Sequence, residues 1–120
     1  LPKLHCIQAE NVNPIASNKT LSKSEIKSTV AGGIAVGSPP RKSEVQSVLR
    51  QSKGFANSVK EASIVEWQIK LAKHEGLFCE PTSAAAFAGL ENLINAKEIN
   101  KNERVLIPIT GSGLKDIFPK

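Results

Sequence analysis

The sequence has no methionine and no tyrosine, and aromatic residues make up only 4% of its 120 residues. It has two cysteines, Cys6 and Cys79, which lie far apart and do not have the spacing of a metal site. Both lie in apolar runs, which favours buried free thiols in a reducing compartment over a disulfide. No apolar run approaches membrane-spanning length and no signal-peptide pattern occurs, so we expect a cytoplasmic protein without membrane contact.

The charge pattern argues against a nucleic-acid partner. Sixteen basic and eleven acidic residues give a net charge of +5, but the lysines are spread along the chain, with acidic residues between many of them. The lysines are not interleaved with the aromatic rings on which bases stack. We therefore predict solvated faces of mixed charge and no binding of nucleic acid.

Length and composition predict one domain or sub-domain over residues 1–120. An apolar fraction of 40% and a charged fraction of 22% are ordinary for a globular chain. The sequence opens at Leu1 directly on a strand-like run, and it lacks even an initiator methionine. We expect it to be the tail of a longer chain.

The order of apolar runs and breakers predicts an α/β fold, with part of a parallel sheet between helices on both faces. Strands are expected at residues 4–9, 55–57, 77–79 and 104–109, and helices at residues 43–53, 58–75 and 81–96. Ser43 with Gln46, and Ser58 with Glu61, fit capping boxes at the starts of the first two helices. Pro81 suits the first position of the third helix. One apolar face is predicted for the second helix: Ala62, Val65, Ile69 and Ala72.

The most informative segment for function follows the strand predicted at residues 104–109. There the chain reads Thr-Gly-Ser-Gly-Leu-Lys-Asp, residues 110–116. In an α/β protein the carboxyl end of a strand is where ligands bind. Gly111 would let the backbone approach a flat ligand, and the Thr110 hydroxyl can form one directional hydrogen bond. The segment could equally be a plain turn or helix cap.

Two further segments carry candidate site residues. Glu80 precedes Pro-Thr-Ser-Ala-Ala, an arrangement that also stabilises a helix start through the helix dipole alone. Gly33 lies in Thr-Val-Ala-Gly-Gly-Ile-Ala-Val, residues 29–36. A residue without a Cβ leaves room for a planar ligand, although a glycine pair can also be a simple turn.

These three segments, in this order, resemble those of threonine synthases, pyridoxal-phosphate (PLP) enzymes of the tryptophan-synthase-β fold group. The resemblance spans residues 2–116 and implies the C-terminal portion of a fold-type II PLP enzyme. It implies that Thr110 bonds the pyridine nitrogen of PLP, that Glu80 and Gly111 lie beside the ring, and that Gly33 lies against one face. A neutral hydroxyl partner would leave that nitrogen largely unprotonated, which suits elimination and replacement chemistry.

The resemblance implies a PLP-dependent lyase that converts O-phospho-homoserine and water to threonine and phosphate. The segment around Gly33 is also similar to that of threonine and serine dehydratases, which remain an alternative, as does a non-catalytic binding module. The Schiff-base lysine and the phosphate-binding glycine loop of the family have no counterpart in this sequence. No catalytic residue and no metal ligand is therefore expected here, and the 120-residue chain alone is expected to lack PLP and activity. It is also expected to self-associate through an exposed sheet edge, or to form a homo-oligomer.

Overall fold

A computed structural model describes residues 1–115 and has α/β architecture. Its elements, in chain order, are strand β1 (Cys6–Ala9), 3-10 helix η1 (Gly32–Ile34), helix α1 (Lys42–Ser52), strand β2 (Ala56–Val59), helix α2 (Glu61–Glu75), helix α3 (Pro81–Asn95) and 3-10 helix η2 (Gly113–Lys115). Asp116, the last residue of the Thr-Gly-Ser-Gly-Leu-Lys-Asp motif, lies outside the described residues.

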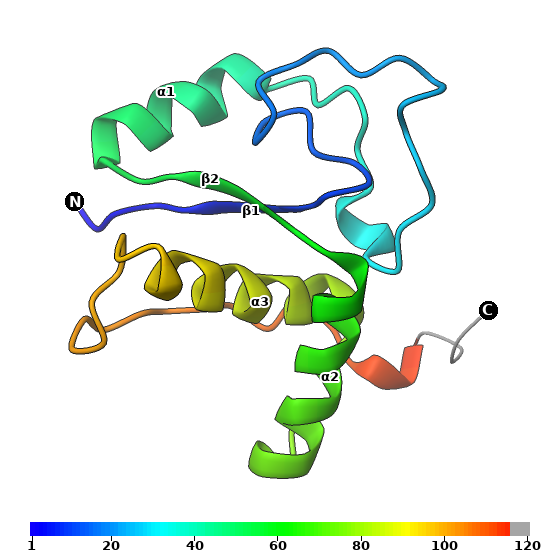
Figure 1. Cartoon of the computed structure of the whole chain (residues 1–120), viewed down its shortest axis with the longest axis vertical. Helices are drawn as coiled ribbons and strands as arrows, with labels where there is room; N and C mark the ends of the chain where they lie inside the picture. Colours follow the sequence, from blue (N-terminus) through cyan, green and yellow to red (C-terminus); the bar gives the residue numbers. More distant parts are fainter. Residues whose placement is uncertain (116–120) are drawn as a thin grey trace.

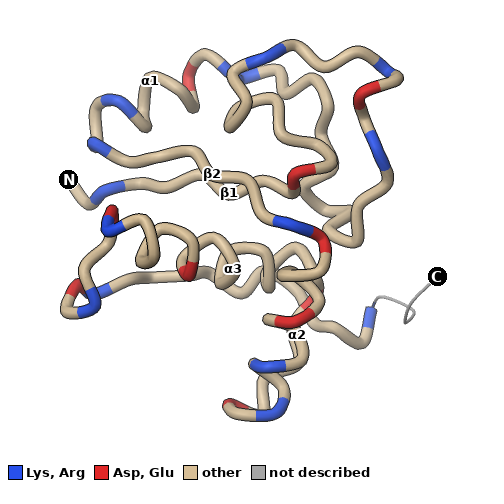
Figure 2. Tube along the Cα trace, in the orientation of Figure 1, with Lys and Arg blue, Asp and Glu red and all other residues tan. Residues whose placement is uncertain are grey.

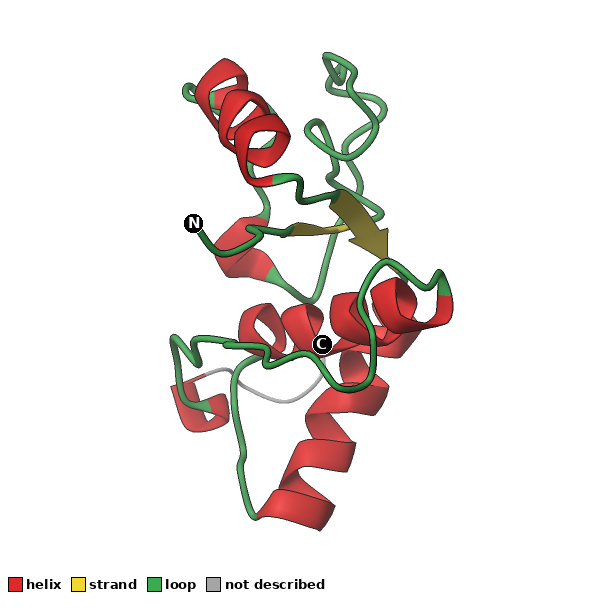
Figure 3. Cartoon of the chain, turned by 90° about the vertical axis from the view of Figure 1, so that its left-hand side faces the viewer, coloured by secondary structure: helices red, strands yellow, loops and turns green. Residues whose placement is uncertain are grey.

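The sheet consists of β1 and β2, which pair in parallel from Cys6 opposite Ala56 to Ala9 opposite Val59. Both views of the chain place the two strands between α1 and α3 (Figures 1 and 3). The predicted layering of a parallel sheet between helices is therefore confirmed for these two strands. The helix α2 packs against α3 and extends away from the sheet (Figure 1).

Small side chains bring α3 close to the sheet. Ala84, Ala85 and Ala88 are buried and share one core cluster with Val59 and Ile64. Gly89, one residue further along α3, lies so near β1 that a Cβ there would overlap the Ile7 side chain. Close packing along this alanine-rich face fixes where the first turn of α3 lies relative to the sheet.

Two predicted helix starts were wrong. The N-cap of α1 is Arg41 and that of α2 is Lys60, and neither side chain forms a capping hydrogen bond. Ser58 cannot cap α2 because its backbone belongs to β2, where it pairs with Gln8. The predicted apolar face of α2 was also wrong, since the buried residues are Ile64, Gln68 and Leu71.

Two predicted strands did not form as strands. Residues 104–109 are extended but lie in no strand within the part of the chain that the structure describes, and Leu106 is 92% exposed. Residues 77–79 contribute a single antiparallel bridge, between Cys79 and Ser112. The apolar pattern at 104–109 is typical of a strand. A strand also needs a hydrogen-bonded neighbour, and residues 1–115 provide none for this segment.

A groove of about 720 Å³ separates the start of the chain from residues 103–108. Its floor is apolar and is formed by α3 and the turn after it, through Ala86, Leu90, Leu93 and Ile99. Its two sides are the segment that leads into β1 and the extended segment after residue 103.

Positions of basic and acidic residues are interspersed along the helices and outer loops (Figure 2). The prediction that the chain does not bind nucleic acid agrees with this distribution and stays a prediction. Within residues 1–115, none of the helices has the length and apolar character needed to cross a membrane.

Candidate functional site

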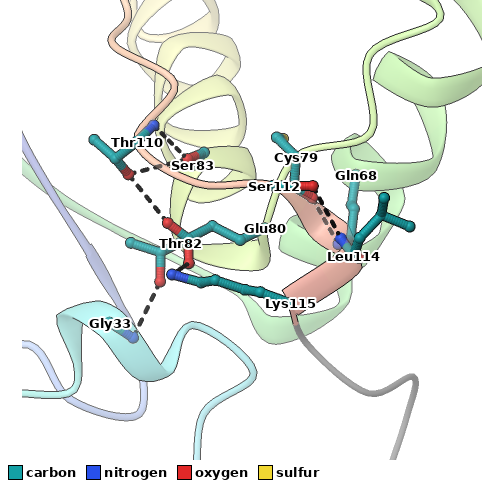
Figure 4. A network of polar contacts seen from close by, with 10 residues as sticks. All are labelled: Gly33, Gln68, Cys79, Glu80, Thr82, Ser83, Thr110, Ser112, Leu114 and Lys115. Atoms are coloured by element: carbon teal, nitrogen blue, oxygen red, sulfur yellow. Dashed lines mark hydrogen bonds and ion pairs between the residues drawn. The ribbon is translucent and has the colours of Figure 1, made fainter.

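The three segments singled out in the sequence meet at the N-terminal end of α3 (Figure 4). This end of α3 lies on the same side of the molecule as the carboxyl ends of β1 and β2 (Figure 1). Gly33 comes from η1, Glu80 is the N-cap of α3, and Thr110 belongs to the segment before η2. The structure therefore brings together residues that are far apart in the sequence.

Backbone hydrogen bonds hold the loop at residues 111–113 against the residues before α3. The Glu80 amide donates to the Gly111 carbonyl at 3.0 Å, and the Gly113 amide donates to the Phe78 carbonyl at 3.0 Å. Behind this pairing, the buried Gln68 side-chain amide donates to the Cys79 carbonyl at 2.8 Å. The loop that follows Thr110 is thus attached at several points to a buried part of the fold.

The side chain of Thr110 is hydrogen-bonded on two sides. Its hydroxyl donates to Glu80 Oε1 at 3.2 Å and lies 3.1 Å from Ser83 Oγ. Its backbone amide also donates to Ser83 Oγ, at 3.0 Å. Thr110 itself is exposed, whereas Ser83 is only 2% exposed. The hydroxyl therefore stands at the surface but is oriented from below by a buried side chain.

Glu80 is buried and ionically paired. Its carboxylate receives the Lys115 ammonium group at 2.7 Å, and the residue is only 5% exposed. The hydrogen bond from Lys115 lowers the pKa of Glu80 below its ordinary value, against the opposing effect of burial, and the Thr110 hydroxyl adds to the lowering. The carboxyl group is consequently ionised at neutral pH and acts only as a hydrogen-bond acceptor.

Two glycines of the site are required by their neighbours in this chain. A Cβ on Gly111 would overlap the Glu80 carboxylate. A Cβ on Gly33 would come within 2.8 Å of the Thr82 hydroxyl oxygen, which accepts a hydrogen bond from the Gly33 amide at 3.1 Å. Both glycines therefore let other segments approach the start of α3 closely, and Gly33 also remains exposed beside it.

Sequence reasoning missed three residues of this network. Thr82, Ser83 and Lys115 all lie inside the quoted motifs, but none of them was singled out as a site residue. A signal was present, because hydroxyl side chains in the first turn of a helix often hydrogen-bond to nearby backbone. Their partners, Gly33 and Thr110, lie far away in the sequence and could not be identified from local spacing.

Residues 1–111 match the sequence family described as pyridoxal-phosphate dependent enzyme. The chain belongs to this family. It is also similar to proteins named threonine synthase: it is 36% identical to that of Methanocaldococcus jannaschii and 38% identical to that of Methanosarcina acetivorans. A third, from Halalkalibacterium halodurans, is 34% identical.

Each of these three alignments covers 97% of this chain. The chain spans only about a third of the length of these curated relatives, 30–32%. The fold-type II α/β prediction is confirmed by the family match together with the observed parallel sheet.

The residues at the start of α3 fit one side of a bound pyridine ring. They provide an exposed hydroxyl at Thr110 for a hydrogen bond to the ring, and an exposed position without a side chain at Gly33. No cluster of three or more histidine, cysteine or acidic side chains suited to a metal ion occurs among residues 1–115. When bound, PLP supplies the electron sink for reactions of amino acids, and the protein orients it.

Proposed function

We propose that this chain is part of a PLP-dependent threonine synthase, a lyase that converts O-phospho-homoserine and water to threonine and phosphate. The observation that carries the proposal is the orientation of Thr110 by Ser83 and Glu80 at the carboxyl end of the sheet. The similarity to proteins named threonine synthase over nearly the whole chain supports it independently.

In this proposal Thr110 forms the hydrogen bond to the pyridine nitrogen. Gly111 keeps the backbone beside Thr110 close to Glu80, and Glu80 holds the threonine hydroxyl in place. Gly33 lies on the open side of α3 and leaves one face of the ring free of a side chain. These four residues bind and orient the cofactor, and none of them is assigned a proton transfer.

The remaining parts of the active site are proposed to lie in the part of the enzyme that this chain does not span. The sequence has no glycine-rich phosphate loop, and none of its lysines lies in the context of a Schiff-base lysine. A single hydrogen bond from Thr110 contributes only about 1 kcal/mol net, whereas a micromolar complex needs about 8 kcal/mol. We therefore expect the 120 residues alone neither to retain PLP nor to catalyse the reaction.

The groove along α3 supports the same view of a larger sheet. Residues 104–109 are extended, and among residues 1–115 no backbone hydrogen bond to their amides is found. The floor of the groove is apolar. We propose that β-strands from the rest of the enzyme fill it, pair with residues 104–109 and complete the sheet.

The test compares the full-length protein with the 120-residue chain. Each is incubated with PLP and O-phospho-homoserine, and threonine and phosphate are measured together. Equal release of both products from the full-length protein is the expected result. Formation of a 2-oxo acid from threonine or serine would instead indicate a dehydratase, and no binding of PLP by the full-length protein would contradict both enzymes.

A further inference from the structure

The segment at residues 30–33, which carries Gly33, reaches the core through one small side chain. Ala31 is fully buried and belongs to the same core cluster as Val59. The two glycines that follow it, Gly32 and Gly33, are exposed and have no side chain that could pack. Glycine backbone is costly to order, so burial of one alanine gives this segment little support. Its position depends on other contacts.

The first amide of the segment is held by Glu61, the first residue of α2. The Val30 amide donates to Glu61 Oε2 at 2.8 Å, although the two residues are 31 positions apart. The other oxygen, Oε1, is buried and has no hydrogen-bond partner among residues 1–115. A carboxylate at a helix start is also stabilised by the helix dipole, without any specific partner. The bond to Val30 is therefore the feature that points to a particular role for Glu61.

The last amide of the segment is held by Thr82, in the first turn of α3 (Figure 4). The Gly33 amide donates to Thr82 Oγ1 at 3.1 Å. A backbone amide can only donate, so the direction of this bond does not depend on how the threonine hydroxyl rotates. Thr110 is attached to the same turn, because its amide donates to Ser83 Oγ. Thr82 therefore links Gly33 to the turn that supports Thr110.

We propose that Glu61 and Thr82 are positioning residues that hold residues 30–33 from both ends, so that Gly33 keeps its place beside the PLP ring. This inference rests on the proposed function, in which Gly33 leaves one face of the ring free of a side chain. Neither Glu61 nor Thr82 is assigned a contact with the cofactor, and each acts through one backbone amide. Without either bond, the exposed glycine backbone must be ordered when PLP binds, and this ordering lowers the affinity.

The experiment measures two quantities in the full-length protein: the dissociation constant of PLP, and the free energy of unfolding without PLP. A residue that only supports the fold changes the second quantity and leaves the affinity of the folded protein unchanged. Thr82→Val keeps the shape but removes the acceptor, and we expect the dissociation constant to rise about fivefold, as for one lost neutral hydrogen bond. Thr82→Ser retains the hydroxyl and should restore the affinity. Thr20→Val, at an exposed position in the loop after β1, is the control.

Two variants of Glu61 separate its hydrogen bond from its charge. Glu61→Ala and Glu61→Gln both remove the charge at the start of α2, but glutamine keeps an oxygen that can accept the Val30 amide. We expect the dissociation constant of PLP to rise about fivefold in Glu61→Ala and to stay near that of the unmodified protein in Glu61→Gln. Glu75→Ala, at the exposed end of α2, and Glu98→Gln, at an exposed position after α3, are matched controls and should not change it.

The outcomes distinguish this inference from the proposed function. Weaker binding in Thr82→Val and Glu61→Ala, with affinity restored in Thr82→Ser and retained in Glu61→Gln, would support it. An unchanged dissociation constant in either folded variant would overturn it and leave the proposed function intact, and if one variant does not fold, the other decides. Equal losses in Glu61→Ala and Glu61→Gln would assign the effect to the helix charge and overturn the role of Glu61. No binding of PLP by the unmodified full-length protein would overturn both.

Discussion

The hydroxyl of Thr110 donates a hydrogen bond to the carboxylate of Glu80 at 3.2 Å, although the two residues are 30 positions apart in the sequence. The contact joins two motifs that were recognised separately. It also joins an exposed residue, Thr110, to a buried one, Glu80. The negative charge of Glu80 is paired with the ammonium group of Lys115. The exposed hydroxyl is therefore oriented by the interior of the protein before any ligand binds.

Thr110→Val tests the role of this hydroxyl in the full-length protein. Valine keeps the shape but leaves Glu80 without one donor and the cofactor without its partner. A lost partner of this kind costs roughly 1–3 kcal/mol, so the dissociation constant of PLP should rise about tenfold, with a large loss of turnover. Binding is measured by the absorbance of retained cofactor after dialysis. Thr20→Val, at an exposed position in the loop after β1, is the control. Identical behaviour of the two variants would contradict the role of Thr110.

Gly111→Ala tests the close approach of the loop to Glu80. The new Cβ would overlap the carboxylate, so the loop must move and the Glu80–Lys115 pair must loosen. We expect the free energy of unfolding of the full-length protein to fall by about 1–3 kcal/mol, as for other overpacked sites. Gly32→Ala is a matched control because a Cβ there meets no atom within 4 Å. Thermal and denaturant unfolding measure both, and a loss in Gly32→Ala as large as that in Gly111→Ala would refute the steric explanation.

The lowered pKa of Glu80 predicts how stability depends on pH. In the folded protein the hydrogen bond from Lys115 lowers this pKa, whereas in the unfolded chain it has its ordinary value of 4.5. The unfolded state therefore takes up the proton first as the pH falls. The stabilisation by ionised Glu80 is fully present above the ordinary pKa and is lost as the pH falls through the lower pKa of the folded state.

Unfolding of the unmodified protein and of Glu80→Gln, followed from neutral pH downwards, measures this dependence. The difference between their free energies of unfolding should be constant near neutral pH and should shrink in acid. Glu98→Gln provides the control and should follow the unmodified protein throughout. A difference that grows in acid would contradict the assigned direction of the pKa shift.

The exposed segment at residues 104–109 predicts self-association of the isolated 120-residue chain. Leu106 is 92% exposed beside the apolar groove, and unpaired extended backbone tends to pair with another chain. Leu106→Asp should lower the average mass measured by light scattering. Leu114→Asp changes a leucine that is 87% exposed but lies in η2, so it should leave the mass unchanged. A monomeric unmodified chain, or equal effects of the two changes, would show that this segment does not drive association.

Local chemistry was sufficient to predict several parts of the fold from the sequence. Pro81 starts α3 because its missing amide proton costs nothing at the first helical position. The helix predicted to end at residue 75 ends there, because Gly76 after it adopts a positive φ of 64°. The positions of β1 and β2 were also identified, although β2 begins and ends later than expected. Each of these features depends on one residue or on a short run of neighbours.

The hydrogen bonds that orient the candidate site depend on residues far apart in the chain, and only the tertiary structure decided them. The sequence identified Gly33, Glu80, Thr110 and Gly111, because their motifs resemble those of one enzyme family, but it gave no reason to place Ser83 beneath Thr110. Those two residues are 27 positions apart, and they meet because α3 packs on the sheet while the loop after residue 110 pairs with residues 78–80. Likewise, the sequence determined that residues 105–109 form an apolar run. Whether they form a strand depends on a hydrogen-bonded neighbour, which is a property of the assembled sheet and not of the segment.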